Sequence, residues 1–192
     1  MKKPIKILHT SDTHLGDPYA HSASEESLKN VLEAVESTNS NFLLIVGDVF
    51  DNERVSNDSV IFFLNQISQT AAPVIILPGN HDLMHSNSIY KRPIFQNIPK
   101  NLYIFKNPTG EEIQFKNLGI SFWGKAMDEH SPKFKPLTNI SFETNKYWKI
   151  ALAHGQFEED GVNSGRSSLI SPQNIIESGC DYVALGHWDS FA

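Results

Sequence analysis

The sequence contains a single cysteine, Cys180, among its 192 residues. An internal disulfide is therefore excluded, and this low cysteine content is typical of proteins from a reducing compartment. The chain also lacks any run of about 18 apolar residues, and Lys2 and Lys3 lead straight into a short strand-like stretch instead of a signal-peptide core. These absences favour a cytoplasmic protein that does not enter a membrane.

A surplus of positive charge is absent as well. Sixteen basic residues face 22 acidic ones, which gives a formal net charge of −6. The surface as a whole therefore does not attract nucleic acid, so any attraction has to come from bound metal ions or a local basic strip. The best candidate strip is residues 125–149, which hold five lysines. Because 40% of the residues are hydrophobic, we expect one ordinary globular domain over residues 1–192.

The chain does contain alternating strand-like and helix-like segments in its first half. Apolar side chains at helical spacing predict a helix that starts near Ser22, where Glu25 completes a capping box, and a second helix capped by Ser56. Strands are predicted by the apolar runs at residues 5–8, 42–46 and 74–77. The β-α-β-α-β order predicts parallel strands joined by right-handed crossovers.

Short, closely spaced strands distinguish the second half, and turn residues between the first three of them predict antiparallel hairpins in a second sheet. The predicted elements are strands at 102–105, 112–115, 120–123, 149–153 and 182–185, a long loop at 125–147 and a helix at 172–178. The two halves together predict an α/β fold. The last polar cluster lies close to residue 192, so we expect the second sheet to lack its last strands.

Five of the apolar runs end at a short polar cluster. The clusters are Asp12-Thr13-His14, residues 47–51, residues 79–82, His154-Gly155 and residues 186–189. Ligands of open α/β sheets collect outside the carboxyl ends of the strands, so we expect these side chains to converge on one rim. Their oxygen and nitrogen donors suit divalent ions such as Mn²⁺, Fe²⁺ or Zn²⁺. Two such ions, about 3.5–4 Å apart, are a common apparatus for cleaving phosphate esters.

The spacing of the donors suggests how two ions would share them. Asp12 and His14 are two residues apart, so strand alternation would direct both toward one ion. Asp48 follows Gly47, which permits a tight turn, and its two carboxylate oxygens make it the candidate bridge between the ions. Asn80 offers a neutral oxygen ligand for the second ion, and His154 and His187 offer imidazole nitrogens.

His81 has a different predicted role, because its side chain should diverge from that of Asn80. An imidazole beside a metal pair can act as a general acid near neutral pH, so His81 is the candidate catalytic residue. Asp82 is its sequence neighbour and is predicted to orient the imidazole.

The spacing of these motifs (DxH, GDxxD, GNHD, HG and GHxD) resembles that of the calcineurin-like metallophosphoesterases. Residues 7–16, ILHTSDTHLG, and residues 181–187, DYVALGH, are most similar to SbcD-type DNA repair exonucleases. The resemblance spans residues 5–189 and implies a four-layer α/β/β/α sandwich. It also implies a dinuclear metal site held by the residues named above, with His81 as the catalytic histidine. Members of this nuclease branch carry a capping domain, which we do not find within residues 1–192, and work with an ATPase partner.

Asp189 departs from the family pattern, which usually places a second histidine two residues after the one that corresponds to His187. An aspartate oxygen still suits Mn²⁺ or Mg²⁺, so Asp189 is kept as a candidate metal ligand. A third carboxylate beside Asp12 and Asp48 would lower the net positive charge of the loaded site, and the site would then attract anions less strongly.

Three functions are consistent with the sequence. The leading hypothesis is a metal-dependent phosphodiesterase, specifically a DNA exonuclease- or endonuclease-like enzyme that uses two ions, Mn²⁺ before Fe²⁺, Zn²⁺ or Mg²⁺. The acidic balance favours an alternative, a phosphatase or phosphodiesterase acting on small phosphate esters. A non-catalytic scaffold with the same fold is the third, kept open by Asp189 and the short C-terminal region. The sequence leaves the oligomeric state open.

Overall fold

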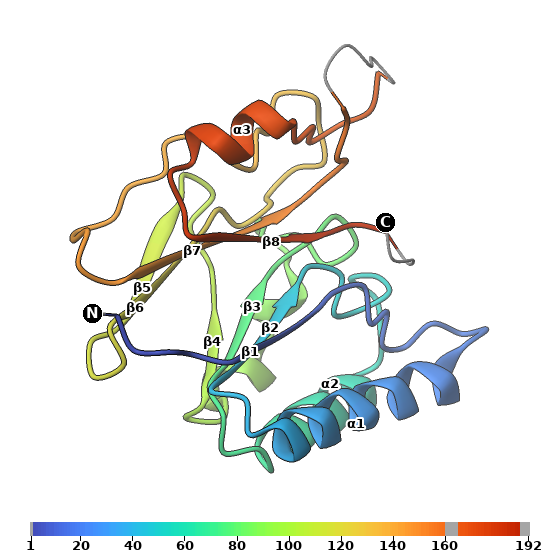
Figure 1. Cartoon of the computed structure of the whole chain (residues 1–192). Coiled ribbons are helices and arrows are strands. Elements are labelled where there is room, and N and C mark those ends of the chain that lie inside the picture. Colours follow the sequence, from blue (N-terminus) through green and yellow to red (C-terminus); the bar gives the residue numbers. More distant parts are fainter. Residues whose placement is uncertain (1, 160–164, 189–192) are drawn as a thin grey trace.

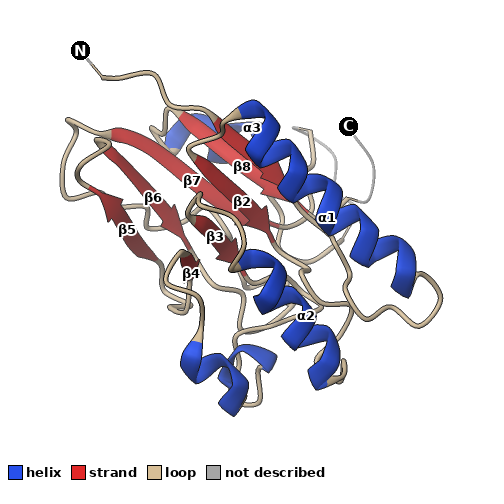
Figure 2. Ribbon diagram, turned by 90° about the horizontal axis from the view of Figure 1, so that it is seen from below, coloured by secondary structure: helices blue, strands red, loops and turns tan. Residues whose placement is uncertain are grey.

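In the computed structural model, which describes residues 2–159 and 165–188, two four-stranded sheets pack face to face (Figure 1). The helices α1 (His21–Thr38) and α2 (Asn57–Ile67) cover the outer face of one sheet, and α3 (Pro172–Glu177) covers the outer face of the other (Figures 1 and 2). The architecture is the expected α/β/β/α sandwich. None of the helices in this part of the chain is long and apolar enough to cross a bilayer.

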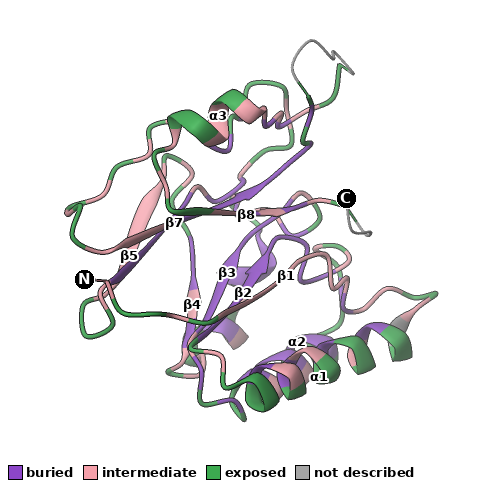
Figure 3. Cartoon of the chain, in the orientation of Figure 1, coloured by how far each residue is buried: buried purple, intermediate pink, exposed green. Residues whose placement is uncertain are grey.

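The first sheet is parallel throughout. It has the order β1-β2-β3-β4, with β1 at Ile7–Thr10, β2 at Phe42–Val46, β3 at Val74–Leu77 and β4 at Leu102–Ile104. All residues of β2 and β3 are buried, because helices cover one face of these central strands and the second sheet covers the other (Figure 3). This explains why both strands are continuous apolar runs.

The position of β4 corrects the predicted hairpin. Leu102 pairs with Val74 in the parallel direction, so this strand belongs to the first sheet. Two short 3₁₀ helices, η1 (Ile89–Lys91) and η2 (Pro93–Asn97), lie in the connection between β3 and β4. Such short helices leave no periodic pattern in the sequence, so nothing in this segment indicates a crossover that returns the chain to the first sheet.

The second sheet has the order β5-β6-β7-β8 and is mixed. Its strands are β5 (Glu111–Phe115), β6 (Ile120–Gly124), β7 (Trp148–His154) and β8 (Tyr182–Gly186). The hairpin of β5 and β6 is antiparallel as predicted, whereas β7 and β8 add in the parallel direction. The helix α3, which crosses from β7 to β8, begins with a capping box made by Ser171 and Asn174.

The two long helices begin differently. Ser56 caps α2 as predicted, since its side chain accepts a hydrogen bond from the backbone N–H of Ser59. The predicted capping box of α1 is wrong, because the helix begins at His21 and its N-cap, Ala20, makes no side-chain cap. Ser22 therefore lies inside the first turn.

Aromatic rings fill the space between the sheets. The ring of Phe42 on β2 lies 4.8 Å from that of Phe115 and 4.9 Å from that of Phe122, both in the second sheet, with edge-to-face geometry. The same apolar core includes residues of α1 and α2, so it runs from the outer helices to the second sheet. Packing on both sides of the first sheet holds its strand ends, and the loops that follow them, at one edge.

Candidate metal centre

The loops after β1 and β2 run side by side beyond the ends of their strands. The backbone N–H of Asp12 donates to the carbonyl of Gly47 over 3.1 Å, and that of His14 donates to the carbonyl of Asp48 over 3.0 Å. The N–H of Leu15 continues this ladder to Val49 over 2.8 Å. The parallel register of the sheet thus extends into the loops and brings Asp12, His14 and Asp48 to one level.

Left-handed backbone, rather than strand alternation, aims these side chains. β1 ends at Thr10, and φ is 56° at Asp12, 43° at His14 and 52° at Asp48. This region disfavours residues that carry a Cβ, so the three conformations depend on the surrounding ladder and packing. Strained residues of this kind cluster at functional sites. The expectation that alternation along a strand aligns Asp12 and His14 is therefore corrected.

Two groups of donor atoms converge at this edge. Asp12, His14 and Asp48 each contribute a ligand atom to one group, and these atoms lie within 4.8 Å of one another. In the other group, the Asn80 side-chain oxygen lies 3.0 Å from both His154 Nε2 and His187 Nδ1. Asp48 belongs to this second group too, since its Oδ2 lies 3.2 Å from His154 Nε2.

This donor set fits a pair of divalent ions. Carboxylate, amide and imidazole donors are brought together from segments up to 175 residues apart, and one carboxylate is shared by both groups. His154 is oriented as metal-binding histidines usually are, because its Nδ1 lies 2.8 Å from the Val46 carbonyl and Nε2 faces the other donors. The six ligands predicted within residues 2–159 and 165–188 therefore lie together, whereas Asp189 falls outside the described residues.

Two glycines leave the space that these donors occupy. A Cβ on Gly47 would overlap the imidazole of His154, and a Cβ on Gly79 would overlap the carboxylate of Asp48. Gly47 also has a φ of 86°, which only glycine adopts without strain. The motif glycines therefore clear room for the donor side chains of His154 and Asp48.

Asp48 and His154 form a buried ion pair in the protein alone. Burial favours the uncharged form of both groups, but their mutual hydrogen bond and opposite charges outweigh it. The pKa of Asp48 is lowered to about 2, and the pKa of His154 is raised to about 9. A cation bound here would take the place of the His154 proton.

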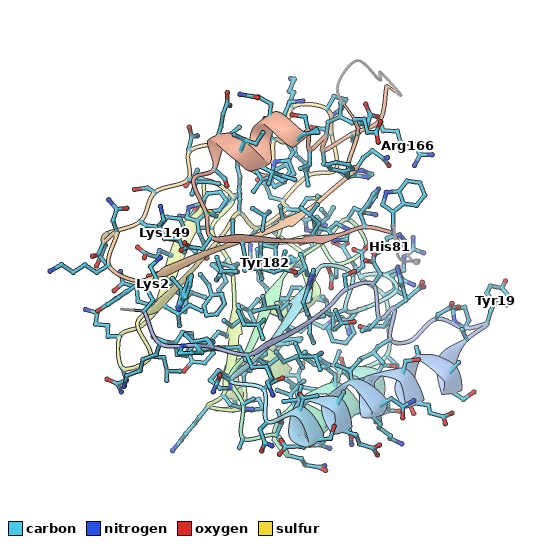
Figure 4. The ribbon with its side chains drawn as sticks, viewed as in Figure 1. Lys2, Tyr19, His81, Lys149, Arg166 and Tyr182 are labelled. Carbon is cyan, nitrogen blue, oxygen red and sulfur yellow. The ribbon has the colours of Figure 1, made fainter. Side chains whose placement is uncertain are left out.

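His81 lies at the exposed edge of the site (Figure 4). Its backbone N–H donates to Asp48 Oδ1 over 2.8 Å, and its Nδ1 lies 2.6 Å from the Asp51 carbonyl. Its ring packs edge-to-face on that of His14, with centroids 4.7 Å apart. The imidazole is thus placed beside the donor groups, with Nδ1 engaged by the loop after β2.

Asp51 is a potential ligand that the sequence reading did not assign. One of its carboxylate oxygens groups with nitrogens of His14 and His81 within 4.8 Å. The sequence did contain an indication of this role, because Asp51 is the second aspartate of the GDxxD motif.

Asp82 is engaged elsewhere than expected. It is fully buried, and its carboxylate accepts hydrogen bonds from the backbone N–H groups of Val49, Phe50 and Gly79 and from the Tyr90 hydroxyl. Burial and the nearby charge of Asp48 raise its pKa to about 6, although these hydrogen bonds oppose the shift. Asp82 therefore braces the loops after β2 and β3, and the Asp51 carbonyl, not Asp82, contacts the His81 imidazole.

The loop after β6 adds a histidine to the rim. The N–H of Met84 donates to the carbonyl of Met127, and the ring of His130 lies 6.1 Å from that of His187. In the predicted lysine strip, the ammonium of Lys125 donates hydrogen bonds to the carbonyl of Lys135 and the hydroxyl of Thr138. Lys125 is therefore already bound within the loop that follows β6.

Comparison with known proteins identifies the family of the chain. The calcineurin-like phosphoesterase family model matches residues 5–190, so the chain belongs to this family. It is 24% identical to the uncharacterized metallophosphoesterase YhaO of Bacillus subtilis, over 97% of this chain and 49% of that protein. It is also 26% identical to the SbcD component of the SbcCD nuclease of Staphylococcus epidermidis, over 95% of this chain and 56% of that protein.

The chain spans about half the length of these two relatives. A shorter match, 34% identical over 86 residues, links 41% of the chain to 21% of the SbcD component of the SbcCD nuclease from Escherichia coli K12. Among solved structures, Pseudomonas putida nuclease MPE aligns with a TM-score of 0.42 and 15% identity, over 86% of this chain and 73% of that one.

Proposed function

We propose that this domain is a metal-dependent phosphodiesterase with a dinuclear centre and that DNA is its substrate class. The observation that carries the proposal is the sharing of Asp48 by two converging donor groups. A carboxylate can bridge two ions, and paired ions are a recurrent arrangement for phosphoryl-ester cleavage. The oxygen-rich donors around Asp12, Asp48 and Asn80 favour Mn²⁺, with Fe²⁺, Zn²⁺ and Mg²⁺ as alternatives.

When bound, two divalent ions supply positive charge that polarises the phosphoryl group and makes water more acidic. Asp48 fixes the spacing of the two donor groups, and the backbone N–H of His81 holds one of its oxygens in place. Asn80 adds a neutral oxygen, which limits the negative charge next to an anionic substrate. The buried ladder between the loops keeps these groups in position without further rearrangement.

His81 is the proposed proton donor. The oxygen of a water molecule that has given one proton to the solvent forms the new bond to phosphorus, and the bond from phosphorus to the leaving oxygen breaks. The leaving oxygen takes a proton from His81, which is then reprotonated from the solvent. Because Nδ1 of His81 contacts the Asp51 carbonyl, the proton to be transferred is the one on Nε2. Asp51 thereby takes the orienting role that was expected of Asp82.

The DNA substrate is supported by the names of the relatives, two of which are components of SbcCD nucleases. By the same resemblance we propose an ATPase subunit as a partner and DNA repair as the process. The single cysteine and the lack of a membrane-spanning helix in the described residues support a cytoplasmic location. The net charge of −6 favours the alternative substrate class, small phosphate esters.

A comparison of three substrates tests the proposal. The protein, loaded with Mn²⁺, is incubated with bis-p-nitrophenyl phosphate, p-nitrophenyl phosphate and linear DNA. We expect hydrolysis of the diester and of DNA, abolished by chelation and restored by Mn²⁺. Preferential hydrolysis of the monoester, p-nitrophenyl phosphate, would show that the protein is a phosphatase and contradict the nuclease proposal. If a folded, metal-loaded protein hydrolyses none of the three substrates, the non-catalytic scaffold is the remaining hypothesis.

A further inference from the structure

A pocket of about 710 Å³ lies beside the metal centre. Its walls come from the two segments that follow the donor residues, with Gly16, Pro18, Asn52, Arg54, Val55 and Ser56 among the lining residues. Neither the predicted metal ligands nor His81 line it. The reaction proposed above therefore leaves this pocket without a use.

The pocket begins where the candidate metal centre ends. Gly16 is two residues beyond His14, and Asn52 directly follows Asp51. The two segments stay paired at this point, because the Asp51 N–H donates to the Leu15 carbonyl over 3.1 Å. Arg54 is the third residue after Asp51, so their Cα atoms are at most about 11 Å apart. A ligand in the pocket is thus within reach of a second group bound at the metal centre.

The loop that carries Arg54 is held in place by another arginine. The guanidinium of Arg92 donates to the carbonyl of Val55 over 2.8 Å and to that of Glu53 over 2.6 Å. It also donates to the Asn57 side chain over 3.2 Å. Because Arg92 fixes the loop from the protein side, the loop keeps its shape without help from the Arg54 side chain.

Arg54 itself is available for a ligand. Its backbone N–H donates to the Asn52 side chain over 2.8 Å, which directs the chain at this turn. Within residues 2–159 and 165–188, no side-chain hydrogen bond or ion pair engages its guanidinium, and the residue is exposed. The other charged residue of the pocket, Asp17, accepts a hydrogen bond from the N–H of Tyr19 over 2.8 Å.

An aromatic side chain stands next to the pocket. Tyr19 follows the lining residue Pro18 and is 98% exposed, and it projects away from the body of the protein (Figure 4). An exposed ring near an exposed cationic side chain such as Arg54 is a combination that binds successive units of a single-stranded nucleic acid, by stacking on bases and attraction to phosphates. The apolar atoms of Pro18 and Val55 offer a surface for a sugar or base.

We propose that this pocket is a subsite for the nucleotide adjacent to the scissile phosphodiester and that Arg54 binds the phosphate of this nucleotide. A guanidinium presents paired N–H donors that match phosphate oxygens. On a protein with a net charge of −6, one free cation beside the metal centre supplies local attraction for a second phosphate. The proposal deepens the proposed function, on which it rests, because it makes the substrate a polynucleotide. Arg54 is a positioning residue, since it acts on a phosphate that does not react.

The test compares Arg54→Gln with Lys100→Gln, which removes an exposed cation next to the start of β4, in two assays. Turnover is measured with Mn²⁺ on bis-p-nitrophenyl phosphate, which has no flanking nucleotide, and on a 5′-phosphorylated thymidine trinucleotide. For Arg54→Gln we expect kcat/KM on the trinucleotide to fall at least tenfold, mainly through KM, while the value on the small diester stays within twofold. Arg54→Lys should recover part of the loss, and Lys100→Gln should match the wild type.

Binding provides a readout that does not depend on turnover. With Ca²⁺ in place of Mn²⁺, the Kd of a fluorescent trinucleotide should rise at least fivefold in Arg54→Gln. An unchanged Kd and unchanged trinucleotide turnover, with the wild type active on the small diester, would overturn the subsite and leave the phosphodiesterase intact. If the wild type hydrolyses neither substrate but binds the trinucleotide more tightly than Arg54→Gln does, the subsite would be supported and the proposed phosphodiesterase function contradicted. Equal losses on both substrates would also contradict the subsite, because the small diester has no second nucleotide.

Discussion

His154 Nε2 lies 3.2 Å from Asp48 Oδ2, and both side chains are almost entirely buried. His154 ends β7 of the second sheet and Asp48 lies in the loop after β2 of the first, so this contact joins the two halves of the sandwich at the metal centre. A buried charge is costly without its partner. The pair therefore stabilises the metal-free protein and at the same time fixes the positions of two candidate metal ligands.

Asp48→Asn should uncouple the two donor groups. The asparagine side-chain oxygen can still accept the hydrogen bond from the His81 N–H, so we expect the fold to persist. It lacks the charge and second oxygen needed for a bridge, so metal affinity should fall by at least about 100-fold. Elemental analysis after dialysis measures the bound metal, with Asp58→Asn at the exposed start of α2 as control. Two ions retained with normal turnover would refute the bridge.

His81→Asn should separate metal binding from proton transfer. Loss of a general acid lowers kcat by about 100- to 10,000-fold when the leaving oxygen is a poor leaving group. The loss should be large on a dinucleotide and small on bis-p-nitrophenyl phosphate, since p-nitrophenolate departs without a proton. Metal content should remain that of the wild type. Equal losses on both substrates would argue that His81 acts in another way.

Asp82→Ala should destabilise the protein before it affects chemistry. The substitution leaves three buried backbone N–H groups and the Tyr90 hydroxyl without their acceptor, which costs about 3–5 kcal/mol. Tyr90→Phe removes one of these bonds and should cost about 1.5–3 kcal/mol. Urea unfolding in the presence of a chelator measures both. An Asp82→Asn protein with wild-type stability but much reduced turnover would return Asp82 to the orienting role first assigned to it.

The metal-free protein should lose stability as the pH rises. In the folded chain the pKa of His154 is about 9, above its ordinary value of 6.5. A raised folded-state pKa contributes stability that is complete below pH 6.5 and disappears as the pH passes through 9. Thermal unfolding in a chelator should show this decline, and Asp48→Asn, which lacks the opposing charge, should not. Mn²⁺ affinity should change in the opposite direction, because the metal displaces the His154 proton.

Gly47→Ala should damage the metal centre through the side chain it displaces. The new methyl group would overlap the His154 imidazole, and the φ of 86° adds backbone strain. Gly119→Ala is the matched control, because its φ of 64° carries a similar strain while the nearest atom to its Cβ is 3.8 Å away. We expect a loss of about 1 kcal/mol for the control and a larger loss, with weaker metal binding, for Gly47→Ala. Equal effects would mean that His154 relocates freely.

Local chemistry was sufficient to predict much of the fold. The apolar runs that became β2 and β3 stand out because both faces of these strands are covered, and Ser56 caps α2 as its hydroxyl predicted. The placement of β4 was wrong, since an isolated strand of three residues carries no information about which sheet it will join. Partners of that kind are chosen by packing between distant parts of the chain.

The same division applies to the site. Asp12, Asp48 and Asn80 could be named as donors because they come soon after the apolar runs that form β1, β2 and β3. Asp51 was not assigned and Asp82 was predicted to orient His81, because acidic residues within such motifs look alike in a sequence. Only burial and hydrogen-bond partners separate the potential ligand Asp51 from Asp82, which is enclosed by four donors.

The sequence by itself determined which side chains stand at the strand ends, because hydrophobic runs and turn residues act over a few neighbours. The tertiary structure decided how these side chains meet. The hydrogen-bond ladder between the loops after β1 and β2 holds Asp12, His14 and Asp48 in the left-handed backbone conformation. The tertiary structure also brought the backbone N–H of His187 to within 2.9 Å of Asp12 Oδ2 across 175 residues. Contacts over such separations arise only when the two sheets pack, since no local preference of the chain specifies them.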